Sequence, residues 1–457
     1  MSYIFEPSQP LPPAPRWLTV GSAIAWILIV ASVAAIIVRP RWMVRGGGAE
    51  RAALPSIERT RSTQLEMVSR LAMGARAFSP DGKGDPSMVG QIDATAKNAI
   101  DEFRGIIMID ELSGDEAALA RLNEFERKNK VVRLREDVDA LRILYKRGLD
   151  HLTARQTQML LDRHGWFGKV AVSHGLPPTD ARRQAALRPA GRAMLVGMGA
   201  AFVGLALLVT GVVLAILGIV FFVQGRLVRA YQPAPPGLAG PLVEAFALYL
   251  AGMVGVSLLL ARLFPEAGLG ASFGLFGLLP LLLVYLRVRG VEWSEIRRDL
   301  GWHRGRGFWR EAGAGLIGYI AGLPVLALGF VATFFLMKPS GNSSSHPIVN
   351  EPIEGAMDVL ELLLLASVGA PIIEETMFRG ALFGHLRAKF GWWISAPIVS
   401  LVFAAIHPQG WVAIPVLGAI AMVLAGLREW RGSLVAPMTA HAFNNGVAVL
   451  MLVLMTG

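Results

Sequence analysis

Residues 371 to 380 read P-I-I-E-E-T-M-F-R-G and place two carboxylates and a guanidinium inside an apolar segment that runs from about 357 to 383. Each such charge costs about 2.5 to 3.5 kcal/mol at the middle of a bilayer. Glu375 and Arg379 share one face of a helix and can neutralise each other. Glu374 points roughly 100° away from that face and is free to line a cavity. The stretch therefore predicts a membrane-spanning helix with polar partners elsewhere in the chain.

The composition around that stretch is typical of a membrane protein. Of 457 residues, 53% are apolar and 17% are charged, and the mean hydropathy is +0.49. Short connections and the absence of a strand pattern predict an all-α polytopic helical bundle in lipid. About nine apolar runs are candidate spans, one near the N-terminus and eight in the C-terminal part: 17–38, 193–223, 238–263, 268–286, 312–337, 357–383, 392–406, 412–427 and 434–455.

Changes in composition divide the chain into four expected parts. Residues 1–38 are an N-terminal lead and membrane anchor, and residues 39–192 are a small helical soluble accessory module inserted after the first span. Residues 193–237 are an additional span and linker. Residues 238–457 form the membrane domain that carries the charged stretch.

Helical signals dominate the accessory module, although the sequence assigns it no task. Ser113 begins an S-x-x-E pattern and Thr153 a T-x-x-Q pattern, and each spacing predicts a capping box at a helix start. Gly165 can end the helix that Thr153 begins. The module's histidines are interpreted as surface or packing residues, because no carboxylate or second histidine stands near them at metal-ligand spacing. These are His151, His164 and His174.

The net charge of +10 does not indicate a nucleic-acid partner, because the basic residues gather in short loops and at the ends of apolar runs. That distribution is typical of topology signals and lipid-headgroup anchors, so membrane lipid is the expected partner. The loop 287–310 holds seven arginines. Alternating spans can place this loop in the cytoplasm, and the same parity puts residues 39–192 outside. The chain has no cysteine, so thiolate catalysis and thiolate metal ligands are excluded.

Two further pairs of polar or aromatic residues lie in later apolar runs. Phe403 and His407 are four residues apart, and so are His441 and Asn445. Residues at this spacing project together from one helix. With Glu374, two histidines, a carboxylate and an amide can therefore converge from three helices.

Such a set can hydrolyse a carbonyl compound in two ways. Glu374 can act as a general base toward water while histidine and asparagine donors stabilise an oxyanion. Alternatively, Glu374, His407 and His441 match a catalytic zinc site with an open position. A non-catalytic alternative is a transporter or partner-binding scaffold that uses the same polar cluster as a proton or ion site.

The three motifs, in their order, resemble those of the CPBP family. They are E-E-x-x-x-R from Glu374, F-x-x-x-H from Phe403 and H-x-x-x-N from His441. The family comprises the type II CAAX prenyl endopeptidases, also called Abi proteins, and bacteriocin-processing or immunity relatives. The resemblance covers about residues 238 to 457 and implies an intramembrane endopeptidase, with a bacteriocin-immunity role as an alternative.

The resemblance also implies a role for each motif residue. Glu374 would activate the water with help from His407, while His441 and Asn445 would lie at the oxyanion. Three residues would support them: Glu375, Arg379 and Phe403. Members of the family are described as metalloproteases, yet a metal-free glutamate mechanism has been argued for them. Two possibilities for the cofactor therefore stay open: a zinc ion held by Glu374, His407 and His441, or no cofactor.

The expected substrate is a protein or peptide, with or without a prenyl group. The expected localisation is an integral, multi-pass position in a membrane, which is the plasma membrane for a bacterial chain. A competing motif, G-x-S-x-G at 270–274, would mark Ser272 as a nucleophile in a soluble hydrolase. No strand precedes it, and its glycines suit helix packing. We therefore expect Ser272→Ala to leave hydrolysis intact.

Overall fold

The computed structural model describes residues 19–37, 63–76, 86–96, 98–129, 132–263, 277–340 and 355–456. All regular structure in these ranges is helical, which confirms the all-α fold class. Within the same ranges, seven helices are long and apolar enough to cross a membrane. The chain is therefore an integral, multi-pass membrane protein. Each of the nine expected runs is helical where it is described, but two of these helices, α12 and α18, are shorter than a span.

The membrane bundle contains the following helices: α1 (Val20–Ile37), α10 (Ala181–Val223), α11 (Pro236–Leu263), α12 (Leu278–Val288), α13 (Trp293–Leu300), α14 (Phe308–Ser340), α15 (Ala356–Leu363), η6 (Leu364–Gly369), α16 (Ala370–Glu375), η7 (Thr376–Leu382), α17 (Phe383–Arg387), α18 (Trp392–Ala405), η8 (Trp411–Ala413), α19 (Ile414–Arg431) and α20 (Val435–Thr456).

Aromatic side chains occupy the centre of the bundle. Phe246 of α11, Phe378 of η7 and Phe403 of α18 are all buried. The Phe378 ring meets each of the other two edge-on, with 5.1 Å between ring centroids. This arrangement is favourable for aromatic quadrupoles and fixes how α18 lies against η7.

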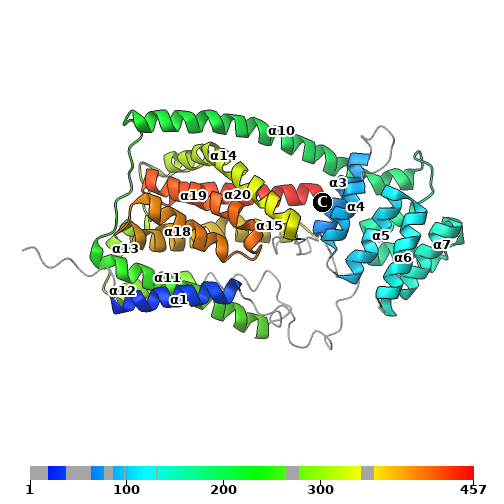
Figure 1. Cartoon of the computed structure of the whole chain (residues 1–457), viewed down its shortest axis with the longest axis horizontal. Coiled ribbons are helices and arrows are strands. Elements are labelled where there is room, and N and C mark those ends of the chain that lie inside the picture. The colour runs from blue at the N-terminus through cyan, green and yellow to red at the C-terminus, as the bar shows by residue number, and fades with distance from the viewer. Residues whose placement is uncertain are drawn as a thin grey trace, which may run out of the picture.

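Helix α1 lies along α11 at one side of the bundle (Figure 1). The indole Nε1 of Trp26 donates to Nε2 of His385, at 3.2 Å. His385 is fully buried and its Nδ1 donates to the carbonyl of Ala239, at 2.7 Å. One histidine thus connects α1, α11 and α17 by side-chain hydrogen bonds.

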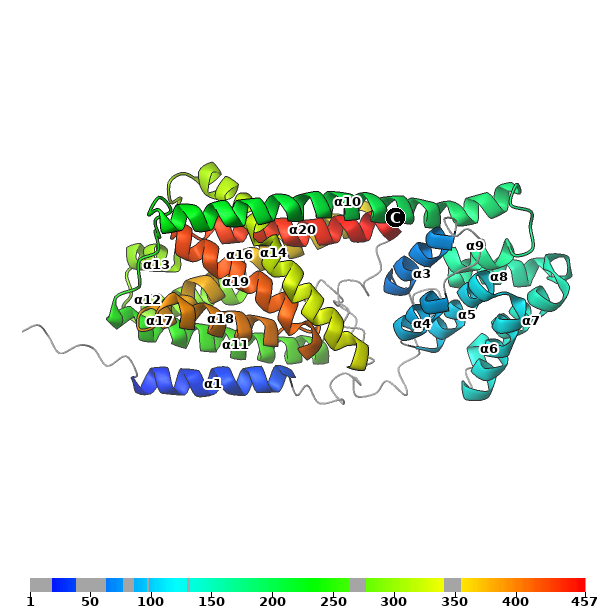
Figure 2. The ribbon, with the colours of Figure 1, turned by 45° about the horizontal axis from the view of Figure 1, so that its top comes forward.

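A second group of helices packs around its own apolar core beyond one end of the bundle (Figures 1 and 2). We call it the module. Its helices are α3 (Thr63–Arg76), α4 (Pro86–Thr95), α5 (Ala99–Ser113), α6 (Asp115–Lys128), η2 (Val132–Leu134), α7 (Arg135–Arg147), η3 (Leu149–His151), α8 (Ala154–His164) and α9 (Trp166–Val172).

The two capping predictions in the module have different outcomes. The Thr153 capping box is confirmed, and α8 ends at Gly165 as expected. The Ser113 box is wrong, because α5 continues through Ser113. The next helix starts after Gly114, whose φ of 91° makes the turn and which has no side chain to cap with. A glycine with positive φ therefore took the position that the S-x-x-E pattern predicted for serine.

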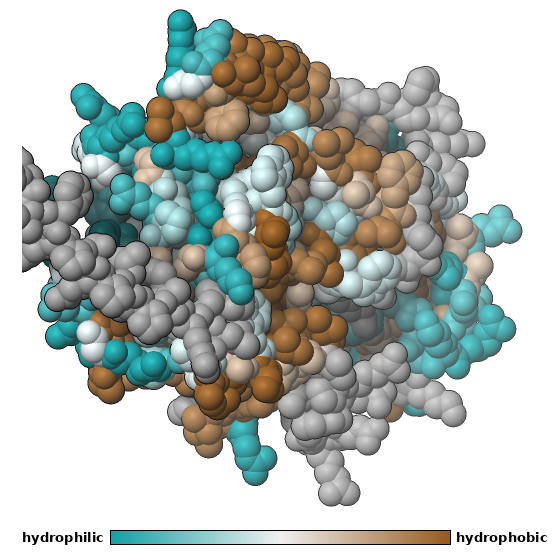
Figure 3. Space-filling view, turned by 60° about the vertical axis from the view of Figure 1, so that its left-hand side comes forward, coloured by the Kyte–Doolittle hydropathy of each residue, from teal (hydrophilic) through white to brown (hydrophobic). Residues whose placement is uncertain are grey.

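Helix α10 joins the module to the bundle as one helix of 43 residues (Figure 1). It runs without a break through the expected part boundary at 192. The α13 segment lies at the end of the bundle away from the module, where the loop 287–310 contributes its arginines. Figure 3 views this end, and hydrophilic side chains gather there beside apolar helix sides. The arginine-rich loop and the module therefore lie at opposite ends of the bundle.

Candidate active site

The charged stretch lies in a helical run that extends without a break from 356 to 387 and contains two π-helical segments, η6 and η7. Pro371 stands between them, at the start of α16. A proline has no N–H to donate to the preceding turn, so the regular α-helical ladder is interrupted there. The second π-helical segment begins directly after Glu374 and Glu375. Such single π turns are frequent at functional sites.

Glu375 and Arg379 form the ion pair that their spacing predicts. Arg379 donates to Glu375 Oε1 at 3.0 Å, and both side chains are fully buried. Arg379 also donates to the carbonyl of Ala421 at 3.2 Å. Its guanidinium lies 4.6 Å from the ring centroid of Phe403, within the range of a cation–π contact. The pair thus connects η7 to α18 and α19.

Glu375 has a further partner that the sequence analysis missed. His441 Nδ1 lies 2.8 Å from the same oxygen, Glu375 Oε1, that Arg379 contacts. The two residues are 66 positions apart, so no local spacing signals the contact. A carboxylate accepts, so Nδ1 carries the proton and Nε2 is left for other partners. Glu375 therefore orients His441 as well as balancing Arg379.

Glu374 faces a cavity of about 440 Å³ between the helices. Its Oε2 is buried and lacks a hydrogen-bond partner among the described residues, and it lies 3.9 Å from His441 Nε2. The lining is mostly apolar. Its polar members are Glu374, His407, Gln409, His441, Asn444 and Asn445. The structure thus brings the four expected catalytic residues to one pocket, together with Gln409 and Asn444, which the sequence motifs did not single out.

His407 is held at the end of α18 by its own helix. Its Nδ1 donates to the carbonyl of Phe403 at 2.6 Å, and the two rings are in tilted contact with 4.3 Å between centroids. The four-residue spacing of the F-x-x-x-H motif therefore has a direct structural reason. Because Nδ1 is the donor, Nε2 of the neutral ring is an acceptor. Phe403 also touches the ring of His441, at 6.1 Å between centroids.

Asn445 and its neighbour form a short chain of amides. Asn445 Nδ2 donates to the carbonyl of Ala366 in η6 at 2.8 Å, and Asn444 Nδ2 donates to Asn445 Oδ1 at 3.1 Å. Asn444 Oδ1 in turn accepts from the hydroxyl of Tyr319, at 3.0 Å. An amide nitrogen has two hydrogens, so Asn445 keeps one donor beyond the contact to Ala366.

A metal at the predicted triad requires donor atoms closer than those in the structure. Zinc bonds to nitrogen and oxygen are about 2.0 to 2.2 Å, so all ligand atoms of one ion lie within about 4.4 Å of one another. Among the described residues, the donors of Glu374, His407 and His441 do not meet even a 4.8 Å criterion. The triad as placed does not fit a zinc ion.

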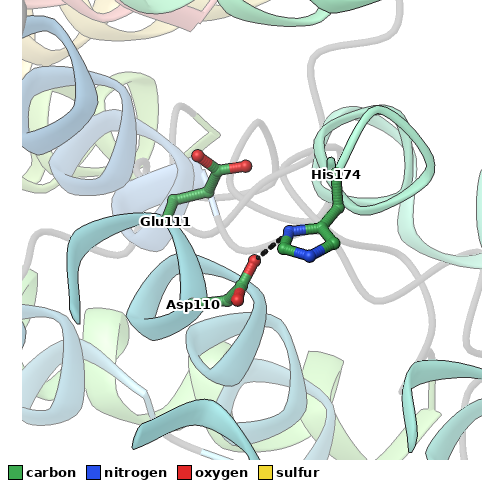
Figure 4. Close-up of side chains that lie close together, drawn as sticks. All are labelled: Asp110, Glu111 and His174. Atoms are coloured by element: carbon green, nitrogen blue, oxygen red, sulfur yellow. Dashed lines mark ion pairs between the residues drawn. The ribbon is translucent and has the colours of Figure 1, made fainter. Parts of the chain in front are cut away.

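A different group does meet that distance criterion, and it lies in the module. Asp110, Glu111 and His174 bring donor atoms within 4.8 Å of one another. His174 Nδ1 is 2.8 Å from Asp110 Oδ2 (Figure 4). Its Nε2 is 3.3 Å from Asp115 Oδ1. No spacing in the sequence signals these carboxylate contacts of His174, because the one to Asp110 spans 64 positions.

Two arginines already pair with Glu111, the third member of that group. Arg183 contacts both oxygens of Glu111 at 2.5 and 2.6 Å, and Arg76 reaches it at 3.1 Å. The hydrogen bond to Asp110 raises the pKa of His174, while burial raises the pKa of Asp110 to about 6. Two arginines and His174 thus face three carboxylates, counting Asp115. A metal ion would have to displace both arginines, so the charge-balanced pairing is the better account of the cluster.

The histidine His164 is also paired, and it is a core residue. It is buried, and its Nε2 lies 3.0 Å from Asp137 on α7. Desolvation lowers its pKa below the ordinary value. The packing interpretation of this residue is confirmed.

Comparison with known proteins shows what the segment that carries the membrane site is similar to. Residues 357–447 match the family described as type II CAAX prenyl endopeptidase Rce1-like. The matched range contains every motif residue predicted from the sequence. This segment is therefore similar to Rce1-like proteins. The sequence-based assignment to CPBP proteins, which include these endopeptidases, is thereby confirmed.

Curated relatives of the Rce1-like segment share about a third of its residues. An uncharacterized 24.3 kDa protein of Escherichia coli is 33% identical over 88 residues, 18% of this chain and 41% of that protein. The uncharacterized protein YpbD of Bacillus subtilis (strain 168) is 33% identical over 102 residues, 22% of this chain and 49% of that protein. The chain thus spans less than half the length of these relatives. No solved structure matches it.

The competing nucleophile motif falls outside the part of the chain that the structure describes. Ser272 and the G-x-S-x-G run at 270–274 belong to the interval between 263 and 277. The expectation for Ser272→Ala therefore stays a prediction.

Proposed function

We propose that this chain is an intramembrane endopeptidase that hydrolyses a peptide bond with water activated by Glu374. The observation that carries the proposal is Glu374 Oε2, a buried oxygen without a partner among the described residues, in a pocket that two imidazoles also line. An unpartnered buried carboxylate oxygen is costly and is expected where a substrate or water completes its contacts. The Rce1-like match supports a CAAX-protease-like endopeptidase in general terms.

In the first step, the water oxygen attacks the peptide carbonyl carbon and Glu374 takes a proton from the water. The carbonyl π electrons move to the oxygen, which becomes an oxyanion. Asn445 offers its remaining amide hydrogen to that oxyanion. His441 also faces the oxyanion through Nε2, which donates a hydrogen bond to it when that nitrogen carries a proton.

In the second step, the tetrahedral intermediate collapses and the carbon–nitrogen bond breaks. The proton held by Glu374 passes to the departing nitrogen, which leaves as an amine. The other product is a carboxylic acid, which loses its proton to water and becomes a carboxylate. His407 assists as an acceptor through Nε2, because its Nδ1 is committed to Phe403. Glu375 and Arg379 position these groups and do not touch the substrate in this scheme. Phe403 lines the pocket and orients His407.

The chemistry of the pocket limits the substrate to chains that bring apolar groups to the site. Apart from its polar members, the lining consists mainly of aliphatic side chains such as Leu417, Ile420 and Leu424. Such a lining accepts apolar residues of a membrane-associated peptide. A prenyl group would satisfy the same surface, so the substrate is proposed as a peptide with or without that modification.

The test compares wild type, Glu374→Gln and the control Glu361→Gln by membrane proteomics and then with purified protein and the identified peptides. Glu361 is a half-buried carboxylate on the same helical run that does not line the pocket. Loss of the general base should lower kcat by about 10² to 10⁴-fold, and the control should cleave like wild type. Cleavage that survives in Glu374→Gln contradicts the proposed site. Wild type that cleaves no peptide favours the transporter or scaffold alternative.

Metal removal supplies a separate check on the mechanism. Because the triad donors are too far apart for one ion, we expect cleavage to survive dialysis against a strong chelator. A loss of activity that added zinc restores, with zinc bound in about one equivalent per chain, would contradict the metal-free scheme.

A further inference from the structure

The pocket has a lining residue from a distant part of the chain. Met67, on α3 of the module, contributes to the same cavity as Glu374 and His441. It precedes these residues by more than 300 positions, and the Rce1-like match at 357–447 does not include it. We propose that α3 forms one wall of the substrate site and that Met67 limits the size of the apolar substrate side chain accepted there. This inference rests on the endopeptidase function proposed above.

Close contact with α10 holds α3 in place. A Cβ on Gly74 would lie 2.6 Å from the carbonyl oxygen of Ala190, so the two helix backbones touch at this glycine. Farther along, a Cβ on Gly197 would lie 3.3 Å from Leu71 and 3.7 Å from Met455 of α20. Three helices thus meet at Gly197, one each from the module, the connecting helix and the proposed catalytic helix.

Arg70 fixes the wall to the helix that carries His441. Its guanidinium donates to the carbonyl of Met455 in the last turn of α20, at 3.1 Å, where helix carbonyls lack intrahelical partners. The same side chain pairs with Glu66 at 2.5 Å and lies 5.3 Å from the ring centroid of Trp166. Arg70 is only 5% exposed. Met67 is one turn before it on α3, so its distance from the pocket is set by a buried contact.

The chemistry of position 67 suits a selective wall. Methionine is unbranched and polarisable and fills irregular apolar space. The neighbouring lining from α20 includes Met451 and Leu452, so this side of the pocket is apolar. A hydrophobic site discriminates by about tenfold or more for a single methylene. Substituting residue 67 should therefore change which side chains are accepted, and should not abolish hydrolysis.

The first test measures selectivity with Met67→Ala, Met67→Trp and the control Val68→Ala. Val68 is the next residue of α3 and is packed against the module core, not the pocket. Paired peptides differ only in the size of one apolar side chain near the scissile bond. We expect Met67→Ala to shift kcat/KM toward the larger side chain by about tenfold, and Met67→Trp toward the smaller one. The control should keep the wild-type ratio. Unchanged ratios in both Met67 variants would overturn the proposal.

The second test does not depend on catalysis. The chain has no cysteine, so Ala448→Cys introduces a single thiol into the pocket lining. In full-length protein, this thiol should react faster with a bulky maleimide when Met67→Ala is present and more slowly when Met67→Trp is present. Its reaction rate with a small methanethiosulfonate should depend less on residue 67. Val68→Ala should have no effect. Labelling rates that do not depend on residue 67 would overturn the proposal that α3 forms a wall of the pocket. If labelling depends on residue 67 but the protein cleaves no peptide, only the proposed endopeptidase function is contradicted.

Discussion

His441 receives contacts from two adjacent glutamates that have different environments. Its Nδ1 is 2.8 Å from Glu375, which is fully buried and paired with Arg379. Its Nε2 faces Glu374, whose side chain is 25% exposed toward the pocket. The same residue type at neighbouring positions thus has two jobs, one structural and one proposed to be chemical.

This difference predicts that replacing glutamate by glutamine has different effects on stability and on cleavage at the two positions. Glu375→Gln leaves Arg379 with an uncompensated buried charge, so the protein should lose about 3 to 5 kcal/mol of stability. Glu374→Gln removes a charge that has no ion partner within hydrogen-bond distance, so stability should be unchanged or slightly higher while cleavage is lost. Thermal unfolding of the purified variants measures the first effect and peptide cleavage the second. Equal stability of both variants would argue against separate roles.

Spacing in the sequence was enough to predict which side chains leave a helix together. It predicted the Glu375 to Arg379 pair and placed His441 beside Asn445 on α20. It could not predict the contact of Glu375 with His441, because the relative rotation of two helices 66 positions apart depends on the packing of the whole bundle. Gln409 was missed because a lone glutamine after a proline has no characteristic spacing.

At the scale of elements, α14 supports the helix that carries His441 through a contact between backbones. A Cβ on Gly315 would lie 2.4 Å from the carbonyl oxygen of Ala436, near the start of α20. Gly313, two residues earlier, has open space around its Cα. Small residues at helix contacts permit this close approach in membranes.

We expect Gly315→Ala to destabilise the protein by about 1 to 3 kcal/mol, because α14 and α20 must separate to fit the methyl group. Cleavage should fall with it, since α20 shifts relative to Glu374. The matched control Gly313→Ala should be neutral or stabilise by about 0.5 to 1 kcal/mol through helix propensity. Unfolding temperatures of the two variants decide the matter, and similar values would contradict the contact.

The hydrophobic runs predicted the helices well, but not their internal irregularities. The stretch from 356 to 387 reads as one apolar helix, and only the structure reveals η6 and η7 within it. A π turn depends on what the neighbouring helices offer to the displaced carbonyls, which a single sequence does not specify. In the same way, hydrophobic periodicity predicts that a helix of the module buries one face, but not that α3 buries it against α10 and α20.

At the scale of the whole molecule, the module and the arginine-rich loop lie at opposite ends of the bundle (Figure 1). Cytoplasmic loops of membrane proteins carry an excess of Lys and Arg. The arrangement therefore supports the expectation that residues 39–192 lie outside, which stays a prediction.

Single cysteines in the cysteine-free chain can test this topology. Arg127→Cys on α6 and Arg304→Cys in the loop 287–310 are both exposed positions. In intact cells, a membrane-impermeant thiol reagent should label the first, and should label the second only after permeabilisation. Arg304→Cys that reacts in intact cells while Arg127→Cys does not would reverse the orientation.

Helix α10 is longer than a bilayer is thick. At 1.5 Å per residue its 43 residues extend over about 65 Å, roughly twice the hydrocarbon thickness of a bilayer. Its contacts with α3, at Ala190 and Gly197, lie on either side of the start of its apolar run at 193. We therefore expect the α3 wall to lie near the level of the lipid headgroups. A substrate would then be selected by how far one of its residues lies above the lipid. Lengthening the juxtamembrane segment of the substrate would change where the substrate is cut.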